Sequence, residues 1–183
     1  MSNAFCIIPV GIDDDSILKA VHEAVNYFEN DVERFDFVDI PTDAHNKARN
    51  QYRATSFLRI AEKGTGKKNI AITDVDIYAS RVDFVFGQAF LNGKACVIST
   101  HRLNPQFYAN DGGCNDGTDD ASNYQMFIER VKKETIHEIG HTFGLHHCYD
   151  SGCVMSFSPG IEEVDAKGMD LCEKCSESLK SLF

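Results

Sequence analysis

The sequence predicts an α/β fold, which some schemes class as α+β, built on a twisted mixed sheet of about five strands with one antiparallel edge strand. Two predicted helices each follow a predicted strand, and this alternation is typical of βαβ crossovers between parallel strands. Further along, Asn92-Gly93 separates two β-rich runs, which is a strong signal for an antiparallel hairpin. We expect two helices to pack on the sheet, followed by a long third helix and a short C-terminal one.

The first strand and helix are the clearest elements of the N-terminal half. Ala4 to Val10 is a continuous apolar run, which is typical of a strand buried on both faces. The acidic residues Asp13 to Asp15 then suit the positive N-terminal end of a helix. The apolar residues of this helix recur at helical spacing and should face the sheet; they are Ile17, Val21, Val25 and Phe28.

The next segments continue the alternation. Phe35 to Ile40 indicates a second strand ended by Pro41, and Thr42 and Asp43 can cap a long second helix that runs to about Glu62. Ile70 to Tyr78 indicates the third strand. The hairpin strands around Asn92-Gly93 are residues 84–91 and 94–100.

The C-terminal half begins with a loop. Asn104 to Asn123 is rich in Asp, Asn and Gly and should form a long surface loop. Tyr124 to Leu145 is the long third helix, because apolar residues form one stripe along it; they are Ile128, Val131, Thr135, Ile139 and Phe143. The last residues, Ser176 to Phe183, should form the short C-terminal helix.

Size and composition indicate one domain spanning residues 1–183. Of the 183 residues, 43% are hydrophobic and 25% charged, as in globular proteins. The net charge of −10 repels nucleic acids and anionic membranes, so neither is an expected partner. We find no transmembrane span or signal peptide, and the seven cysteines are odd in number. Both observations favour a cytoplasmic protein with reduced thiols; the oligomeric state stays open.

The segment His137 to Met155 carries the chemistry. His137 and His141 are four residues apart, so a helix places both imidazoles on one face, where they can close on one Zn²⁺ with Glu138 as general base. Gly144 can end the helix in a left-handed turn, which lets His147 reach the same metal. Three His ligands leave the fourth position to water, as in catalytic zinc sites. The alternative interpretation is a solvated helix face that carries two ordinary histidines and binds no metal.

This segment resembles the metzincin clan of zinc metalloproteases, in which a Met-containing turn, here at Met155, lies beneath the zinc. Four cysteines that follow the third His resemble the signature of the archaemetzincin (archaelysin) family: Cys148, Cys153, Cys172 and Cys175. The resemblance implies a metzincin-like fold, with residues 1–146 carrying the sheet and the active-site helix and residues 147–183 the Met-turn and cysteines. It also implies a second, structural zinc, so we expect two Zn²⁺ per chain.

The cysteine spacing supports the second zinc independently. Cys172 and Cys175 form a CxxC knuckle that can turn two thiolates toward one ion, and Cys148 and Cys153 supply two more sulfurs for a closed tetrahedral site. A redox CxxC pair, a disulfide or four unrelated thiols are the alternatives. Of the other cysteines, Cys6 and Cys96 lie in strand-like runs.

The metzincin resemblance also places bound substrate along the strand before Asn92. A free sheet edge offers unpaired N–H and C=O groups to an extended peptide, which gives Phe84, Gly87, Gln88 and Phe90 as candidate substrate-binding residues. An ordinary edge strand is the alternative. The sequence therefore predicts a zinc metallopeptidase, endopeptidase or aminopeptidase, that hydrolyses peptides or proteins. The competing hypothesis is a zinc-stabilised module that binds peptides without cleaving them.

Overall fold

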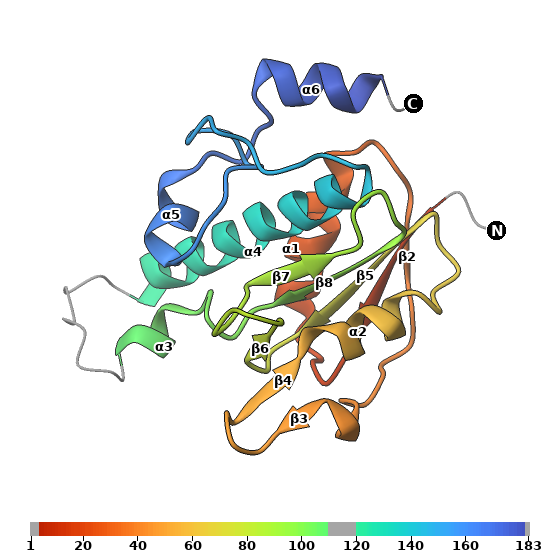
Figure 1. Ribbon diagram of the computed structural model, residues 1–183, viewed down its shortest axis with the longest axis vertical. Coiled ribbons are helices and arrows are strands. Elements are labelled where there is room, and N and C mark those ends of the chain that lie inside the picture. Colours follow the sequence, from red (N-terminus) through yellow and green to blue (C-terminus); the bar gives the residue numbers. More distant parts are fainter. Residues whose placement is uncertain (1–3, 110–119, 182–183) are drawn as a thin grey trace.

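A five-stranded sheet lies at the centre of the computed structural model, which describes residues 4–109 and 120–181 (Figure 1). Its strands, in spatial order, are β2 (Val32–Arg34), β1 (Phe5–Pro9), β5 (Lys68–Thr73), β8 (Ala95–Ser99) and β7 (Gly87–Ala89). The first four are parallel neighbours, and β7 pairs antiparallel with β8 at the edge. The predicted mixed sheet with one antiparallel edge strand is confirmed.

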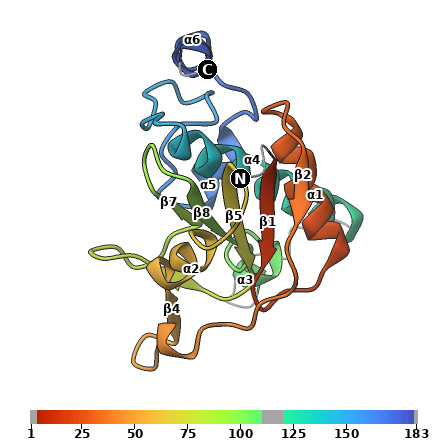
Figure 2. The same ribbon diagram turned by 90° about the vertical axis from the view of Figure 1, so that its right-hand side faces the viewer.

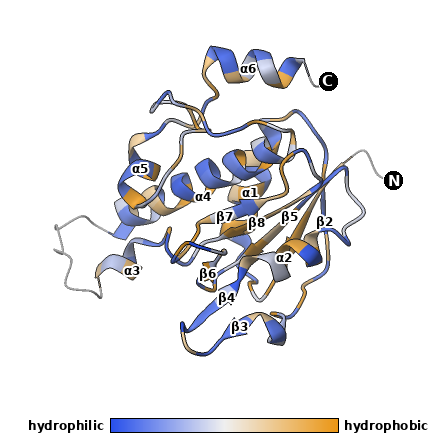
Figure 3. Ribbon diagram, in the orientation of Figure 1, coloured by the Kyte–Doolittle hydropathy of each residue, from blue (hydrophilic) through white to orange (hydrophobic). Residues whose placement is uncertain are grey.

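Helices cover both faces of this sheet (Figure 2). Helices α1 (Asp15–Asn26) and α4 (Asp120–Thr142) pack on one face, and α2 (Ala54–Ala61) packs on the other. Successive side chains of a strand point to opposite faces, so Phe5 and Ile7 of β1 join the first core cluster while Cys6 and Ile8 join the second. The central strands are accordingly the most hydrophobic part of the ribbon (Figure 3).

The predicted second strand is displaced. Strand β2 is Val32–Arg34 rather than Phe35 to Ile40, and Phe35 and Phe37 are 42% and 52% exposed. The return from α1 turns at Glu29, whose φ is 53°, and β2 pairs with β1 directly after it, Phe5 opposite Val32. After β2 the backbone keeps two contacts with β1 and the residue beyond it: the N–H of Phe35 donates to the carbonyl of Ile7, and Val38 forms an isolated bridge with Val10.

The long second helix predicted from Thr42 to Glu62 is wrong. A short 3₁₀ turn, η1 (Thr42–Ala44), is followed by β3 (His45–Asn46), β4 (Gln51–Arg53) and only then by α2. Asn50, with a φ of 51°, interrupts any helix here, and residues 45–53 have no apolar stripe to bury. Strand β4 instead pairs with β3 and with β6 (Ile77–Tyr78) in a second sheet of three strands.

The predicted third strand divides between the two sheets. Strand β5 ends at Thr73 in the large sheet, and β6 belongs to the small one. Between them, Asp76 accepts hydrogen bonds from both Arg102 (2.8 and 2.7 Å) and Gln51 (3.0 Å). The chain therefore leaves the first sheet at the point where these side-chain donors hold the carboxylate of Asp76.

The remaining helices differ from the prediction mainly in their bounds. A short helix, α3 (Pro105–Ala109), lies in the predicted loop, and α4 begins at Asp120 rather than Tyr124. Residues 110–119 of that loop, Cys114 among them, lie outside the described residues, as do the last two residues of the predicted C-terminal helix. Helices α5 (Ile161–Ala166) and α6 (Glu173–Lys180) follow. In the described ranges no helix has the length and apolarity needed to cross a membrane.

Removing the N-cap of α1 should lower the stability of the protein and should also make that stability depend less on pH in the acid range. The carboxylate of Asp14 accepts from the backbone N–H groups of Ser16 and Ile17, and the Ser16 hydroxyl holds the pKa of this carboxyl below its ordinary value. Because the pKa is lowered on folding, the stabilisation is present above the ordinary value and disappears as the pH falls through the lowered one. Asp14→Ala should cost about 1 kcal/mol at pH 7.

Asp14→Asn is the matched control, since it keeps the acceptor oxygen and removes the charge. Urea unfolding at pH 7 and at pH 3 is the measurement. We expect the alanine deficit to be smaller at pH 3 than at pH 7, because part of the capping energy belongs to the charged carboxylate, and the asparagine variant to lie between wild type and alanine at pH 7. An alanine deficit of the same size at both pH values would contradict the assigned cap.

Candidate metal centre

Two histidines of α4 are fixed by hydrogen bonds to backbone carbonyls. The Nδ1 of His137 lies 2.8 Å from the carbonyl oxygen of Val154, and the Nδ1 of His141 lies 2.7 Å from that of Leu145. A carbonyl oxygen only accepts, so each Nδ1 carries the proton and each Nε2 keeps a lone pair. Such bonds fix both the tautomer and the ring orientation of a metal-binding histidine.

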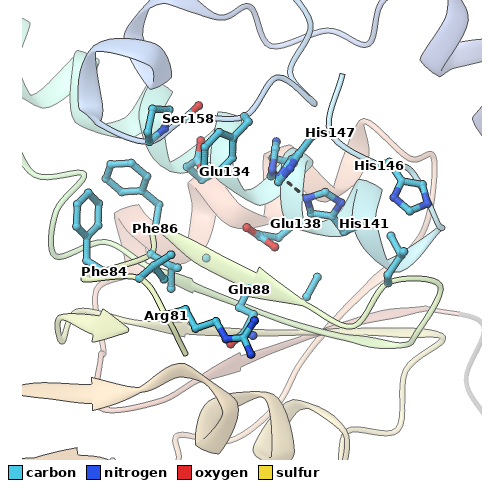
Figure 4. A pocket seen from close by; sticks show the side chains of 18 of the residues that line it. Arg81, Phe84, Phe86, Gln88, Glu134, Glu138, His141, His146, His147 and Ser158 are labelled. Carbon is cyan, nitrogen blue, oxygen red and sulfur yellow. Dashed lines mark hydrogen bonds between the residues drawn. The ribbon is translucent and has the colours of Figure 1, made fainter. Parts of the chain in front are cut away.

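The two free nitrogens face each other, and a third ring joins them. The Nε2 atoms of His137 and His141 are 3.0 Å apart (Figure 4). The ring of His147 stands 5.3 Å from that of His137 and 4.9 Å from that of His141. One nitrogen from each ring lies within 4.8 Å of the others. Three neutral imidazoles with converging lone pairs form a donor set that fits Zn²⁺.

The surroundings favour the neutral form of these rings, although His137 is buried, His141 half-buried and His147 exposed. Desolvation is the largest cause that lowers the pKa of all three histidines, to about 4 for His141. The ammonium of Lys167 lowers each of these pKa values further. Metal binding requires the unprotonated imidazole, so the surroundings prepare all three rings for it.

The turn after α4 brings His147 back to the helix. Gly144 has a φ of 95°, its N–H bonds to the carbonyl of His141, and the N–H of Leu145 bonds to that of Gly140. These two bonds form a Schellman motif, which ends a helix with a left-handed residue. The left-handed turn expected at Gly144 is therefore present.

Met155 lies against the helix under the histidines. Its side chain is fully buried, and its Sδ would be 2.5 Å from a Cβ placed on Gly140. Any side chain at Gly140 would therefore push this loop away from α4. Because the carbonyl of the preceding residue, Val154, accepts from His137, the same contact sets the position of that hydrogen bond.

The three histidines open into a cleft of about 690 Å³, which β7 borders on one side. Glu138 lies in it, buried, with its Oε2 lacking any hydrogen-bond partner in the described part of the chain. Burial raises the pKa of this carboxyl well above its ordinary value; nearby Glu134 adds to the rise and Lys167 opposes it. A buried, unpartnered carboxyl that faces a cleft is suited to proton transfer.

The candidate substrate-binding residues are placed differently from one another. Phe84, Gly87 and Gln88 line the cleft, whereas Phe90 is not among its lining residues and is 38% exposed. A Cβ on Gly87 would lie 2.5 Å from the Cγ of Glu138. The absence of a side chain at Gly87 therefore leaves room for the Glu138 side chain.

Several residues that line the cleft were not among the candidate site residues predicted from the sequence. Glu134 precedes His137 by one helical turn, a spacing that could have indicated a shared face. Phe157 and Ser158 reach the cleft because the chain turns back after Met155, and no local pattern shows this. The exposed ring of Phe157 contacts that of His147 at 4.9 Å. His146 also lines the cleft, at the end away from Glu134 (Figure 4).

The four cysteines form a second cluster beyond the Met-containing turn. One sulfur from each lies within 4.8 Å of the others, and the Sγ atoms of Cys148 and Cys172 are 3.7 Å apart. All four thiols are free, so the disulfide reading finds no support. The N–H of Cys172 donates to the Sγ of Cys153. Four sulfurs gathered from two distant segments fit a tetrahedral zinc site.

A scan of protein-family models matches residues 42–181 to peptidase family M54. The chain belongs to this family. An archaemetzincin of Natronomonas pharaonis is 43% identical over 176 residues, which cover 94% of this chain and 97% of the relative. The family assignment made from the motif is thereby confirmed, and this M54 chain is a zinc metallopeptidase that acts on peptide or protein substrates.

Solved structures agree with the family and the fold. The crystal structure of an archaemetzincin from Methanopyrus kandleri superposes with a TM-score of 0.81 at 33% identity, covering 98% of this M54 chain and 95% of that one. A zinc-dependent peptidase from Methanocorpusculum labreanum gives 0.75 at 28% identity, covering 96% and 100%. The predicted metzincin-like fold is confirmed.

Gly144→Ala should destabilise the M54 chain by about 1 to 2 kcal/mol, because alanine must adopt the left-handed conformation. Gly152→Ala is the control, since its backbone lies outside the left-handed region and its Cβ would meet only Asp150 Oδ1, at 3.4 Å. Urea unfolding of both variants beside wild type is the measurement. Equal stability of the two variants would show that the conformation at Gly144 is not required.

Proposed function

We propose that the chain hydrolyses peptide bonds at a zinc ion held by His137, His141 and His147, with Glu138 as the general base. One observation carries the proposal: two imidazoles whose Nδ1 protons are committed to carbonyls direct their Nε2 lone pairs at each other across 3.0 Å. Two lone pairs at this distance repel unless a cation or a proton lies between them. Burial disfavours the proton, which leaves a metal ion.

The protein supplies the proton transfer. When bound, Zn²⁺ supplies a Lewis acid that lowers the pKa of water and polarises a carbonyl. Glu138 accepts the proton of the attacking water on Oε2, the oxygen without a partner, and returns it to the leaving amine. The ring of Phe157 lies beside the proposed metal ligand His147, with the two ring centroids 4.9 Å apart. Because a phenylalanine has no hydroxyl, it cannot donate a proton to the reacting carbonyl.

The exposed edge of β7 gives the substrate its alignment. This strand pairs with β8 on one side only and ends the sheet on the other. Its free N–H and C=O groups can pair with an extended peptide, as other sheet edges do. Gly87 stands directly over Glu138, so a peptide paired along β7 passes the proposed base with its backbone.

The second proposed zinc is structural. Cys148, Cys153, Cys172 and Cys175 would fill all four positions of a tetrahedral ion and leave none for substrate. The ion would join the start of α6 to the loop that holds His147 and Met155. Its binding energy would then be folding energy for this loop.

A peptide-binding module without activity is the competing function, and the burial of Glu138 argues against it. An unpartnered buried carboxyl costs free energy, and binding alone does not need one beside the three histidines.

Glu138→Ala should lower the rate of peptide cleavage by about 10²- to 10⁴-fold, because the proton acceptor is lost. Peptide binding and zinc content should remain. The measurement is turnover of a quenched fluorescent peptide library under zinc-replete conditions. Gln125→Ala, at an exposed position near the start of the same helix, is the control and should stay near the wild-type rate. A wild-type protein that cleaves nothing would favour the binding module.

Cys172→Ser should lower the zinc content from two ions per chain to one and reduce the thermal midpoint by at least about 5 °C. Elemental analysis and calorimetry are the measurements. Cys6→Ala is the control, because it removes a buried thiol outside the cluster. Unchanged zinc content together with an unchanged midpoint would remove the structural role from these cysteines.

A further inference from the structure

Unsatisfied polar atoms collect in the cleft. Six buried side-chain nitrogen or oxygen atoms lack a hydrogen-bond partner in the described part of the chain. Four of them belong to residues that line the cleft: Gln88, Glu134, Glu138 and Ser158. Oε1 of Glu134 lies 2.7 Å from the ammonium of Lys167 in an ion pair. Within the described ranges, the three cleft atoms without any partner are therefore those of Gln88, Glu138 and Ser158. Since a buried polar atom without a partner costs free energy, their concentration here indicates that a ligand supplies the partners. The proposed mechanism uses only Glu138.

Glu134 and Ser158 occupy one end of the cleft. Glu134 lies one turn before Glu138 on α4, and Figure 4 shows Phe84, Phe86 and Ser158 gathered at the same end, with His146 at the other. This end is therefore a recess beside the proposed base, where a side chain next to the scissile bond can enter.

The polar end of this recess has no net charge. The ammonium of Lys167 lies 2.7 Å from Oε1 of Glu134, and the side chains are only 1% and 4% exposed. A carboxylate oxygen has two lone pairs, so Oε1 can accept one hydrogen bond in addition to this ion pair. A substrate ammonium entering here would be a second buried cation on one carboxylate, which desolvation disfavours. A neutral donor faces no such cost.

Aromatic rings form the wall of the recess. Phe84 and Phe86 meet edge to face with their centroids 5.3 Å apart, and Phe86 is only 5% exposed. The guanidinium of Arg102 lies 4.3 Å from the Phe84 ring and is held by Asp76. A fixed aromatic wall selects another flat ring by edge-to-face or offset packing.

The direction of the bound peptide follows from the elements on either side. Gly87 lies over Glu138, and the N–H of Asn92 bonds to the carbonyl of His141, so β7 and α4 run the same way along the cleft. Antiparallel pairing is the more stable ladder. A peptide paired antiparallel to β7 runs toward the Phe86 end, so the residue in the recess follows the scissile bond.

We propose that the recess formed by Phe84, Phe86, Ser158 and Glu134 is a subsite for tyrosine at the position directly after the scissile bond. The ring packs against the phenylalanines, and the hydroxyl donates to Oε1 of Glu134 while accepting from the hydroxyl of Ser158. The inference rests on the proposed function, since it names the side chain that this cleft prefers.

The test measures binding without turnover. Two extended peptides that differ only by Tyr or Phe at one position are titrated into zinc-loaded Glu138→Ala protein by calorimetry, with a Lys peptide as a third arm. We expect the Tyr peptide to bind about tenfold more tightly than the Phe peptide, from a hydrogen bond to a charged acceptor, and the Lys peptide to bind most weakly. Mapping of wild-type cleavage products should place Tyr directly after the cut.

Variants separate the subsite from a general effect on the cleft. Ser158→Ala in the same background should reduce the Tyr-to-Phe ratio to about threefold without changing Phe affinity, and replacing the buried pair by Glu134→Leu with Lys167→Met should remove the preference. Ser151→Ala, an exposed serine of the loop after α4, is the control. Equal affinity for Tyr and Phe, or equal weakening of both by Ser158→Ala, would overturn the subsite.

The hydrolytic function and the tyrosine subsite can be contradicted independently of each other. Since the affinity ratio needs no turnover, a wild type that binds with Tyr preference but cleaves nothing contradicts the hydrolytic function alone. A wild type that cleaves peptides with equal kcat/KM for Tyr and Phe contradicts the subsite alone.

Discussion

The backbone of Val154 is the constraint on which both clusters depend. Its carbonyl accepts from Nδ1 of His137 at 2.8 Å, and its N–H donates to the carbonyl of Asp170 at 2.9 Å. One bond sets the tautomer and rotation of a histidine on α4, and the other ties the same loop to the segment that carries Cys172. A displacement of this residue would therefore disturb the imidazole cluster and the cysteine cluster together. The proposed structural zinc acts at this point, because it would stabilise the second of the two bonds.

Buried cations of α4 hold α5 against this helix. Arg130 of α4 makes a two-pronged contact with Asp165 at 2.7 and 2.6 Å, and Lys133 donates to the carbonyls of Val164 and Asp165 at the end of α5. Lys167, just beyond α5, returns to Glu134. Carbonyls at a helix end lack intrahelical donors, so cations from α4 complete α5 and hold it in place.

These contacts also explain the fixed position of the segment between Met155 and α5. Removing one partner of a buried ion pair leaves an uncompensated charge and typically costs about 3–5 kcal/mol. Replacing both partners by apolar groups avoids this cost, and for that reason the subsite test above changes Glu134 and Lys167 together. The pair therefore connects the segment just beyond α5 to α4 and also leaves the polar end of the recess without net charge.

The sequence predicts what is local and misses what depends on distant partners. The spacing of His137 and His141 and the left-handed turn at Gly144 follow from helix geometry within one or two turns, and the structure has both. Thr42 and Asp43 carry a helix-capping signal, yet no helix follows directly: β4 forms instead, because Ile77 and Tyr78 of β6 offer it a parallel partner much later in the chain. Likewise, nothing near Glu134 indicates that Lys167 will neutralise it. The recess could not be found before the fold brought these two side chains together.

The position of the edge strand over the histidines follows from the unsatisfied end of α4. The last carbonyls of a helix need donors from elsewhere. The N–H of Asn92 supplies one to His141 at 2.9 Å, and the ammonium of Lys68 supplies another to Thr142 at 2.6 Å while also bonding to the carbonyl of Gly93. The turn between β7 and β8 is thus fixed to the helix by the groups that complete that helix. Because β7 extends from this turn, the contacts that complete α4 act together with the close approach of Gly87 to Glu138 to set the distance between strand and helix.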